Sequence, residues 1–122
     1  MAWRNISRGV RAISIFLAAA CVAPWANAVD FDKDVKPVLE RRCAKCHAYG
    51  KRKGGLSMET RESLLKGGEN GKVVVAGKTK DSLFLELLEE EDASDRMPQK
   101  ADKMPNEEIA LLKAWVKEGL PW

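Results

Sequence analysis

Apolar residues recur at helical spacing in four stretches of this chain, and polar loops separate the stretches. The first stretch covers residues 32–42, and its expected buried face consists of Val35, Val38 and Leu39. Asp32 or Asp34 is placed to cap its amino end, and Pro37 is compatible with a helix only in the first turn. We therefore predict a helix that ends directly before Cys43.

The last stretch, residues 107–118, has the clearest helical pattern. Asn106 is a good capping residue, and Glu107 and Glu108 place negative charge at the positive end of the helix dipole. Gly119 follows directly, as is typical of a helix end. The residues expected on the buried side are Ile109, Leu112, Trp115 and Val116.

Two shorter helices are predicted between these stretches. Thr60 can cap a helix that runs to residue 66 and stops at Gly67. A further helix over residues 80–90 would place apolar side chains on one side, namely Leu83, Phe84, Leu87 and Leu88. The pattern as a whole indicates an all-α protein with three to four helices.

Residues 1–28 have the layout of a secretory signal peptide. Three arginines and no acidic residue accompany an apolar run of about a dozen residues, and Ala26-Asn27-Ala28 fits the small-x-small cleavage pattern. The run is much shorter than the ~20 residues that a membrane-spanning helix needs. We therefore predict cleavage after Ala28, export to the periplasm, and a mature chain of residues 29–122 without a spanning segment.

Cys21 leaves an alternative open for localisation. Processing as a lipoprotein at Cys21 would anchor the mature chain to the membrane by lipid, facing the periplasm. Bacterial lipoproteins usually have leucine three residues before this cysteine, and Ala18 stands there. We therefore favour the soluble periplasmic form over the anchored one.

The basic excess of the full chain comes from the predicted leader. The chain has 21 Lys and Arg against 18 Asp and Glu, and three of the arginines lie in residues 1–28. The mature chain thus has 18 charges of each sign, which gives no electrostatic reason to expect nucleic-acid binding. We expect one monomeric domain, whose modest core would gain from a bound apolar group.

Cys43-Ala44-Lys45-Cys46-His47 is the segment with the most specific chemistry. Cys-x-x-Cys-His is the spacing at which a c-type haem is attached. The two thiols bond to the vinyl groups of the porphyrin, and the histidine binds the iron. The sequence therefore predicts one covalent haem c, with Cys43 and Cys46 as thioether residues and His47 as the proximal axial ligand.

A disulfide, a redox dithiol and a zinc site are the alternatives for this cysteine pair. A zinc site needs about four ligands, whereas the mature chain offers two cysteines and one histidine. A thioredoxin-like dithiol would need a βαβ setting, which the pattern around Cys43 does not indicate. The histidine directly after Cys46 favours haem attachment.

The sixth iron ligand must come from a residue other than histidine, because His47 is the only histidine of the chain. A methionine, a lysine or an open position holding water remain. We expect Met58 to fill a gap in the core. Met97 and Met104 each precede a proline, which stiffens the backbone around them. Met97 lies in the middle of a loop, so its side chain can reach the iron more freely than that of Met104, which directly precedes the last helix. We therefore predict Met97 as the distal ligand, with Met104 as the fallback.

These segments resemble the planctomycete-type cytochrome c domain (PSCyt1-like), within the class I c-type cytochromes. The resemblance extends over residues 31–122 and implies a small cytochrome c-like fold, three to four helices around one covalently bound haem. In that family the methionine of the Arg-Met-Pro segment is the axial ligand, which implies Met97, and Met104 stands where leucine is usual. The resemblance is also based on four other segments, namely Lys53-Gly54-Gly55-Leu56, Thr60-Arg61-Glu62, Lys66-Gly67-Gly68-Glu69 and Glu107-Glu108-Ile109.

His/Met ligation would make this protein a carrier of single electrons between redox partners, and no enzyme. The alternative is a haem-based ligand sensor or a peroxidase-like enzyme, in which the sixth position is open or labile. A cluster of basic residues could steer an acidic redox protein toward the haem, namely Lys45, Lys51, Arg52 and Lys53. Arg61 is a candidate partner of a haem propionate.

Overall fold

Five α-helices make up most of the secondary structure in this computed structural model, which describes residues 28–122. They are α1 (Lys36–Arg42), α2 (Ala44–His47), α3 (Arg61–Lys66), α4 (Leu83–Glu89) and α5 (Asn106–Lys117). A π-helical turn, Phe31–Val35, leads into α1, and 3-10 turns occur at Lys53–Gly55 and Thr79–Asp81. The described residues contain no β-strand, only an isolated bridge between Gly68 and Gly71.

The predicted all-α class is confirmed, with five α-helices in residues 28–122 where three to four were expected. The additional helix is α2, because the backbone leaves helical geometry at Cys43 and starts again at Ala44. Within the same residues, no helix is long and apolar enough to cross a membrane. Residues 1–27, which include Cys21 and most of the predicted signal peptide, lie outside the described part, so cleavage and lipidation stay predictions.

Helix α1 is preceded by a cap that the sequence pattern did not identify. The Oδ1 of Asp30 accepts a hydrogen bond from the Lys33 amide at 3.0 Å, and the Asp34 carboxylate accepts one from the Asp30 amide at 3.0 Å. The prediction of Asp32 or Asp34 as the cap is therefore wrong. Pro37 lies in the first turn of α1, where its missing N–H costs no intrahelical hydrogen bond.

Helix α5 has the predicted buried side, and its start differs from the prediction. Ile109, Leu112, Trp115 and Val116 are all buried. Asn106 is the first helical residue and not the cap, because extended Pro105 takes the cap position and makes no side-chain cap hydrogen bond. The carbonyl of Pro105 accepts from the amides of Glu108 and Ile109, which starts the helix without a capping side chain.

The end of α5 folds back on the start of the domain. Gly119 has a φ of 92°, and this left-handed residue lets the Leu120 amide donate to the carbonyl of Trp115. The next turn places the Trp122 ring on Phe31 with a centroid distance of 4.1 Å. Arg61 at the start of α3 donates to the carbonyls of Leu120 and Gly119 at 2.9 and 3.0 Å, so its guanidinium stabilises this turn.

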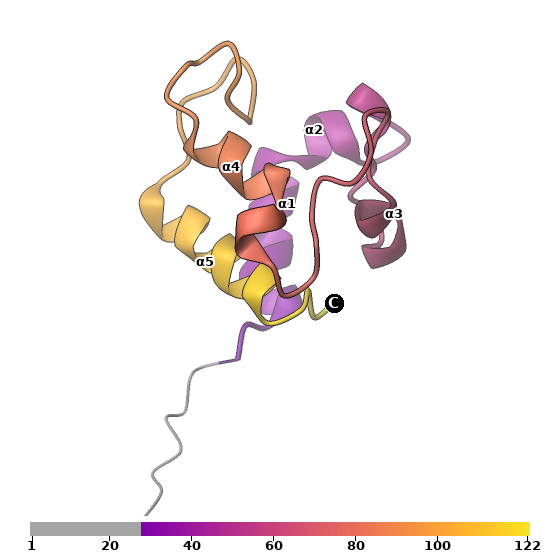
Figure 1. Ribbon diagram of the computed structural model, residues 1–122, viewed down its shortest axis with the longest axis vertical. Coiled ribbons are helices and arrows are strands. Elements are labelled where there is room, and N and C mark those ends of the chain that lie inside the picture. Colours follow the sequence, from indigo (N-terminus) through magenta and orange to yellow (C-terminus); the bar gives the residue numbers. More distant parts are fainter. Residues whose placement is uncertain (1–27) are drawn as a thin grey trace, which may run out of the picture.

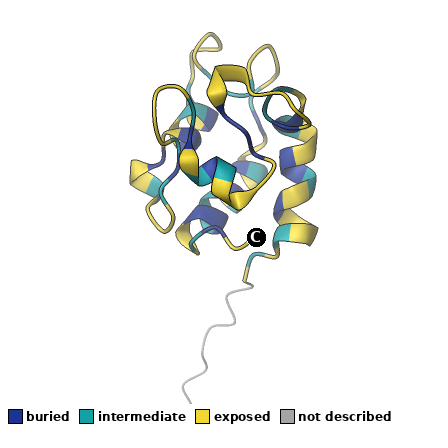
Figure 2. Cartoon of the chain, turned by 90° about the vertical axis from the view of Figure 1, so that its right-hand side faces the viewer, coloured by how far each residue is buried: buried dark blue, intermediate teal, exposed yellow. Residues whose placement is uncertain are grey.

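The hydrophobic core lies between α5, α4 and the first helical segment. In Figure 1, α4 and α5 lie on one side of the domain, and α2 and α3 lie on the other. Buried positions (dark blue in Figure 2) alternate with exposed ones along the helices. Helix α4 buries Phe84, Leu85 and Leu88, whereas Leu83, predicted on this face, is 44% exposed. The buried face of α4 differs from the predicted one because residues 79–81 form a 3-10 turn and α4 begins only at Leu83.

Glu108 connects the first turn of α5 to the last turn of α1. Its two carboxylate oxygens accept from Nη2 of Arg41 and Nε of Arg42, each at 2.9 Å. Burial raises the pKa of Glu108, but the hydrogen bonds from Arg42 and Arg41 outweigh it and hold the pKa below its ordinary value of 4.5. This pair of contacts fixes the end of the helix that leads directly to Cys43.

We expect Glu108→Gln to lower the free energy of unfolding by about 1–2 kcal/mol at neutral pH, because two charge-assisted hydrogen bonds lose their anion. Since the native pKa is lowered, the contribution of Glu108 is complete above its ordinary value of 4.5 and disappears as the pH falls through the native pKa. Urea unfolding of both proteins at neutral and acidic pH measures this difference. Glu107→Gln is the matched control in the same helical turn, and an equal loss in both variants would contradict the role of Glu108.

Candidate haem attachment site

Cys43, Cys46 and His47 lie on one face of a single helical turn. The amides of Cys46 and His47 both donate to the carbonyl of Cys43, at 3.2 and 3.0 Å. Residues three and four positions apart share a face of a helix, so the two thiols and the imidazole project to the same side. The structure thus brings together three of the four predicted site residues.

The two thiols have different surroundings. Cys43 is buried, with 8% of its surface exposed, whereas Cys46 is half-buried, and both are free thiols. Burial raises the pKa of the Cys43 thiol to about 12, Arg42 opposes this rise, and Cys46 and Glu108 add to it. Cys43 therefore stays protonated at neutral pH and belongs to the hydrophobic core cluster, next to which an apolar porphyrin would lie.

The imidazole of His47 is oriented by the backbone. Its Nδ1 lies 3.2 Å from the carbonyl oxygen of Leu56. Because a carbonyl oxygen can only accept a hydrogen bond, Nδ1 holds a proton, and in the neutral imidazole Nε2 is then the nitrogen with the lone pair. A second hydrogen bond, from the Met58 amide to the His47 carbonyl at 2.7 Å, fixes the same two segments to each other. Nε2 is therefore the nitrogen that can bind a metal.

A close backbone contact holds the segment that contains Leu56. The Glu69 amide donates to the carbonyl of Gly54 at 2.9 Å, and Gly68 packs so tightly that a Cβ there would lie 2.5 Å from the Gly54 oxygen. Only glycine fits at residue 68 without moving backbone atoms. The glycine-rich loops after His47 and after α3 thus act together to position the carbonyl that orients the histidine.

Met97 is half-buried in the loop between α4 and α5. Its amide donates to the carbonyl of Leu87 at 3.0 Å, and its side chain packs against the core cluster that includes Cys43. The Met97–Pro98 peptide bond is cis. Met97 therefore lies at the edge of the core, as an axial ligand must, and ligation itself stays a prediction.

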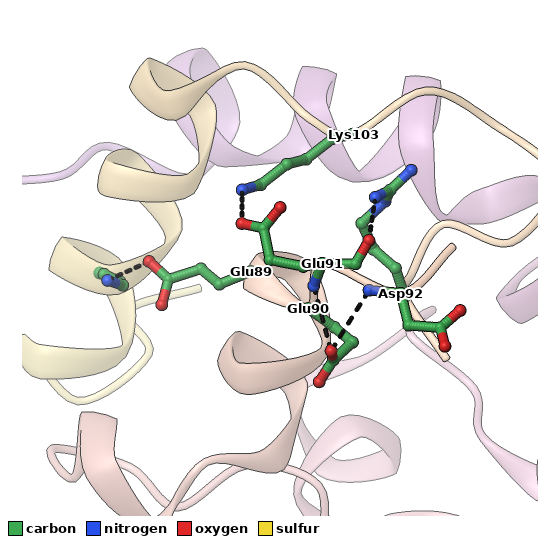
Figure 3. A network of polar contacts seen from close by, with 7 residues as sticks. Glu89, Glu90, Glu91, Asp92 and Lys103 are labelled. Atoms are coloured by element: carbon green, nitrogen blue, oxygen red, sulfur yellow. Dashed lines mark hydrogen bonds and ion pairs between the residues drawn. The ribbon is translucent and has the colours of Figure 1, made fainter. Parts of the chain in front are cut away.

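The acidic run before Met97 fixes its loop. Figure 3 shows Glu91 paired with Lys103, at 3.0 Å, while Glu89 pairs with Lys113 of α5. Glu90 accepts hydrogen bonds from the next two amides, those of Glu91 and Asp92. These acidic side chains connect the end of α4 to α5 and to the far end of the loop, so Met97 lies in a tethered segment.

The two other methionines are part of the core. Met104 is 2% exposed and Met58 is 8% exposed, and both belong to the hydrophobic cluster. This agrees with the packing role that was expected for each of them. Met104 remains the fallback ligand, because the burial of a thioether does not by itself separate packing from ligation.

A cavity of about 550 Å³ lies beside the helical turn that contains the two thiols. Ala44 and Ala48 line it, whereas Cys43, Cys46 and His47 do not. Its other lining residues are partly apolar or aromatic and partly charged, namely Phe31, Leu39, Tyr49, Met58, Trp122, Asp32, Lys36, Glu40 and Glu59. The three residues predicted to attach the haem are therefore not part of this concavity.

An all-α fold with two thiols and an imidazole on one helical face is the arrangement of the c-type cytochromes. Residues 43–100 match the family model for planctomycete cytochrome C. A search of the curated proteins gives no significant match, and neither does a search of the solved structures. The predicted resemblance is confirmed over a shorter segment than expected, since α1 and α5 lie outside the match.

A cytochrome c domain of this kind implies haem c, and the residues present fit that group. Two unpaired thiols lie in the required spacing, and the Leu56 carbonyl leaves Nε2 of His47 available. Arg61, a candidate propionate partner in the sequence, already donates two hydrogen bonds to the turn after α5. The sequence alone did not point to Leu56, because a backbone carbonyl has no residue-type signal.

Proposed function

We propose that this protein carries single electrons as a monohaem c-type cytochrome. The observation that carries the proposal is the hydrogen bond between Nδ1 of His47 and the Leu56 carbonyl, which presents Nε2 on the same face as both thiols. A fixed tautomer and ring orientation are what an axial histidine needs. In this proposal Cys43 and Cys46 form the two thioether bonds, and Met97 supplies the second axial ligand.

Axial ligation by His47 and Met97 would suit electron transfer better than catalysis. A bound haem supplies an iron that changes oxidation state by one electron, and a thioether ligand favours its ferrous form. The tethered loop that contains Met97 would keep the sulfur in place in both oxidation states. With both axial positions occupied, the iron would offer no open position to oxygen or peroxide.

The proposed location is the periplasm, or the periplasmic face of the membrane if Cys21 is lipidated. The proposed partners are redox proteins with an acidic docking surface. Four basic side chains around the attachment segment support this choice, because all are exposed: Lys45, Lys51, Arg52 and Lys53. Charge complementarity of this kind raises association rates and falls with ionic strength.

We expect the purified holoprotein to show a reversible one-electron titration and no rapid binding of carbon monoxide in the reduced state. A closed sixth position makes carbon monoxide compete with a protein ligand, so binding should be slow until denaturant is added. The haemochrome spectrum of the same sample establishes the type and number of haems. Rapid carbon monoxide binding without denaturant would favour the sensor or peroxidase-like alternative.

A further inference from the structure

The backbone amide of Val29 is directed at a carboxylate at the end of α5. Its N–H donates to Oε2 of Glu118 at 2.9 Å, although the two residues are 89 positions apart in the chain. Glu118 is the C-cap residue, which follows α5 directly. The contact therefore connects the segment that precedes α1 to the last helix of the domain.

Two further sets of contacts fix the position of the Val29 nitrogen. The Val29 side chain is half-buried and packs against the hydrophobic core cluster. The next residue, Asp30, accepts a hydrogen bond from the Lys33 amide and donates its own amide to the Asp34 carboxylate, each at 3.0 Å. The backbone on both sides of the Val29 carbonyl is thus held, and the Val29 nitrogen stays beside Glu118.

Val29 is also the residue at which the mature chain is predicted to begin. Hydrolysis after Ala28 adds one water molecule across the peptide bond, which leaves a carboxylate on Ala28 and an amine on Val29. An α-amine has an ordinary pKa of about 7.7–8.0, so it is mostly protonated at neutral pH. Cleavage therefore changes the donor that meets Glu118 from a neutral amide into a cation with three N–H bonds.

A cation is the donor that Glu118 needs at this place. Its carboxylate lies at the carboxyl end of α5, where the helix dipole makes negative charge unfavourable. Hydrogen bonds from a charged donor are about twice as strong as those from a neutral one. The carboxylates nearest to Val29 in the chain, Asp30 and Asp34, already accept from backbone amides. Glu118 is therefore the carboxylate that the new charge would reach, with Lys117 as the charged residue next to it in α5.

We propose that removal of the leader after Ala28 creates an ion pair between the Val29 ammonium and the Glu118 carboxylate. Maturation then completes the contact between the start of the mature chain and the end of α5, where the Trp122 ring already stacks on Phe31. The inference rests on the predicted cleavage site and does not require the haem. Processing at a site other than Ala28 would leave the Val29 nitrogen as an amide, without this ion pair.

The test measures the pKa of the Val29 amine in the exported holoprotein, by acylation at a series of pH values and mass spectrometry of the N-terminal peptide. We expect this pKa to exceed its ordinary value by about 0.2–0.7, the range for an exposed ion pair. Glu118→Gln should return the pKa to its ordinary value, because the amine loses its anionic partner. Glu107→Gln is the matched control, since it removes the same charge from the other end of α5. It should leave the pKa as in the parent.

An ordinary pKa of the Val29 amine in the parent protein would overturn the inference, whatever the variants show. An equal fall in Glu118→Gln and Glu107→Gln would overturn it as well, because it would reflect net charge and no specific pair. The same mass spectra identify the first residue of the mature chain, and a chain that starts at any residue other than Val29 refutes the proposal. The proposed function fails in a different way, through an exported protein without added haem mass, so the two failures are distinguishable.

Discussion

Replacing Met97 with alanine is expected to abolish the near-infrared band of methionine–iron ligation and to lower the reduction potential by a few tenths of a volt, within the ~0.8 V range that axial ligands control. The physical reason is the loss of a thioether, which stabilises ferrous iron. The reduced variant should also bind carbon monoxide rapidly, because its sixth position is open. Absorption spectroscopy of the ferric protein and a redox titration measure both effects.

Methionine 104 provides the control for this experiment. Met104→Leu should keep the near-infrared band and the potential, because leucine fills a similar volume in the core. Met104→Ala should keep them too while lowering the free energy of unfolding by about 2–5 kcal/mol, as buried large-to-small substitutions do. A band that survives in Met97→Ala and disappears in Met104→Leu would reverse the assignment of the distal ligand.

Replacing both Cys43 and Cys46 with alanine is expected to eliminate the covalent haem entirely. Without thioether bonds, the exported chain should have the mass of bare polypeptide and no haem absorption after an acid–organic extraction. We also expect a large loss of stability, because a domain of this size buries a modest core and an attached porphyrin would complete it. Intact-mass measurement and far-ultraviolet circular dichroism check these two results.

Cys21→Ser is the matched cysteine control, since Cys21 lies in the predicted leader. This variant should retain the full haem mass, which separates haem attachment from a general effect of removing a thiol. A mature mass that starts at Val29 in the parent supports signal-peptide cleavage, whereas a lipid-modified Cys21 would establish the anchored form. A parent protein without added tetrapyrrole mass would contradict the covalent attachment of haem.

The helical elements were largely predictable because local patterns specify them. The stripe of Ile109, Leu112, Trp115 and Val116 is buried as the helical spacing predicts, and Thr60 caps α3 in a capping box with Ser63. These features depend on residues within one or two turns of each other. Element starts were less predictable, as Asn106 and Asp30 show, because several neighbouring residues are of types that can cap a helix.

The support of the candidate site was not predictable, because it consists of contacts between loops that no helical spacing or turn pattern connects. The Leu56 carbonyl that orients His47 and the Gly68–Gly54 contact that holds it involve backbone atoms, which have no signature in the residue types. The hydrogen bonds of Arg61 could not be predicted for the same reason. Its side chain could have reached many acceptors, and the fold directs it to the turn after α5.

The sequence by itself determined the residues that can attach a haem, because the Cys-x-x-Cys-His motif needs only five consecutive residues. It also determined the helical class, since apolar spacing follows the period of the helix. Only the tertiary structure decided which His47 nitrogen is free, how the Met97 loop is tethered, and that the Val29 nitrogen meets Glu118. Each of these depends on how separate loops and helices pack against one another, which the residue types do not specify.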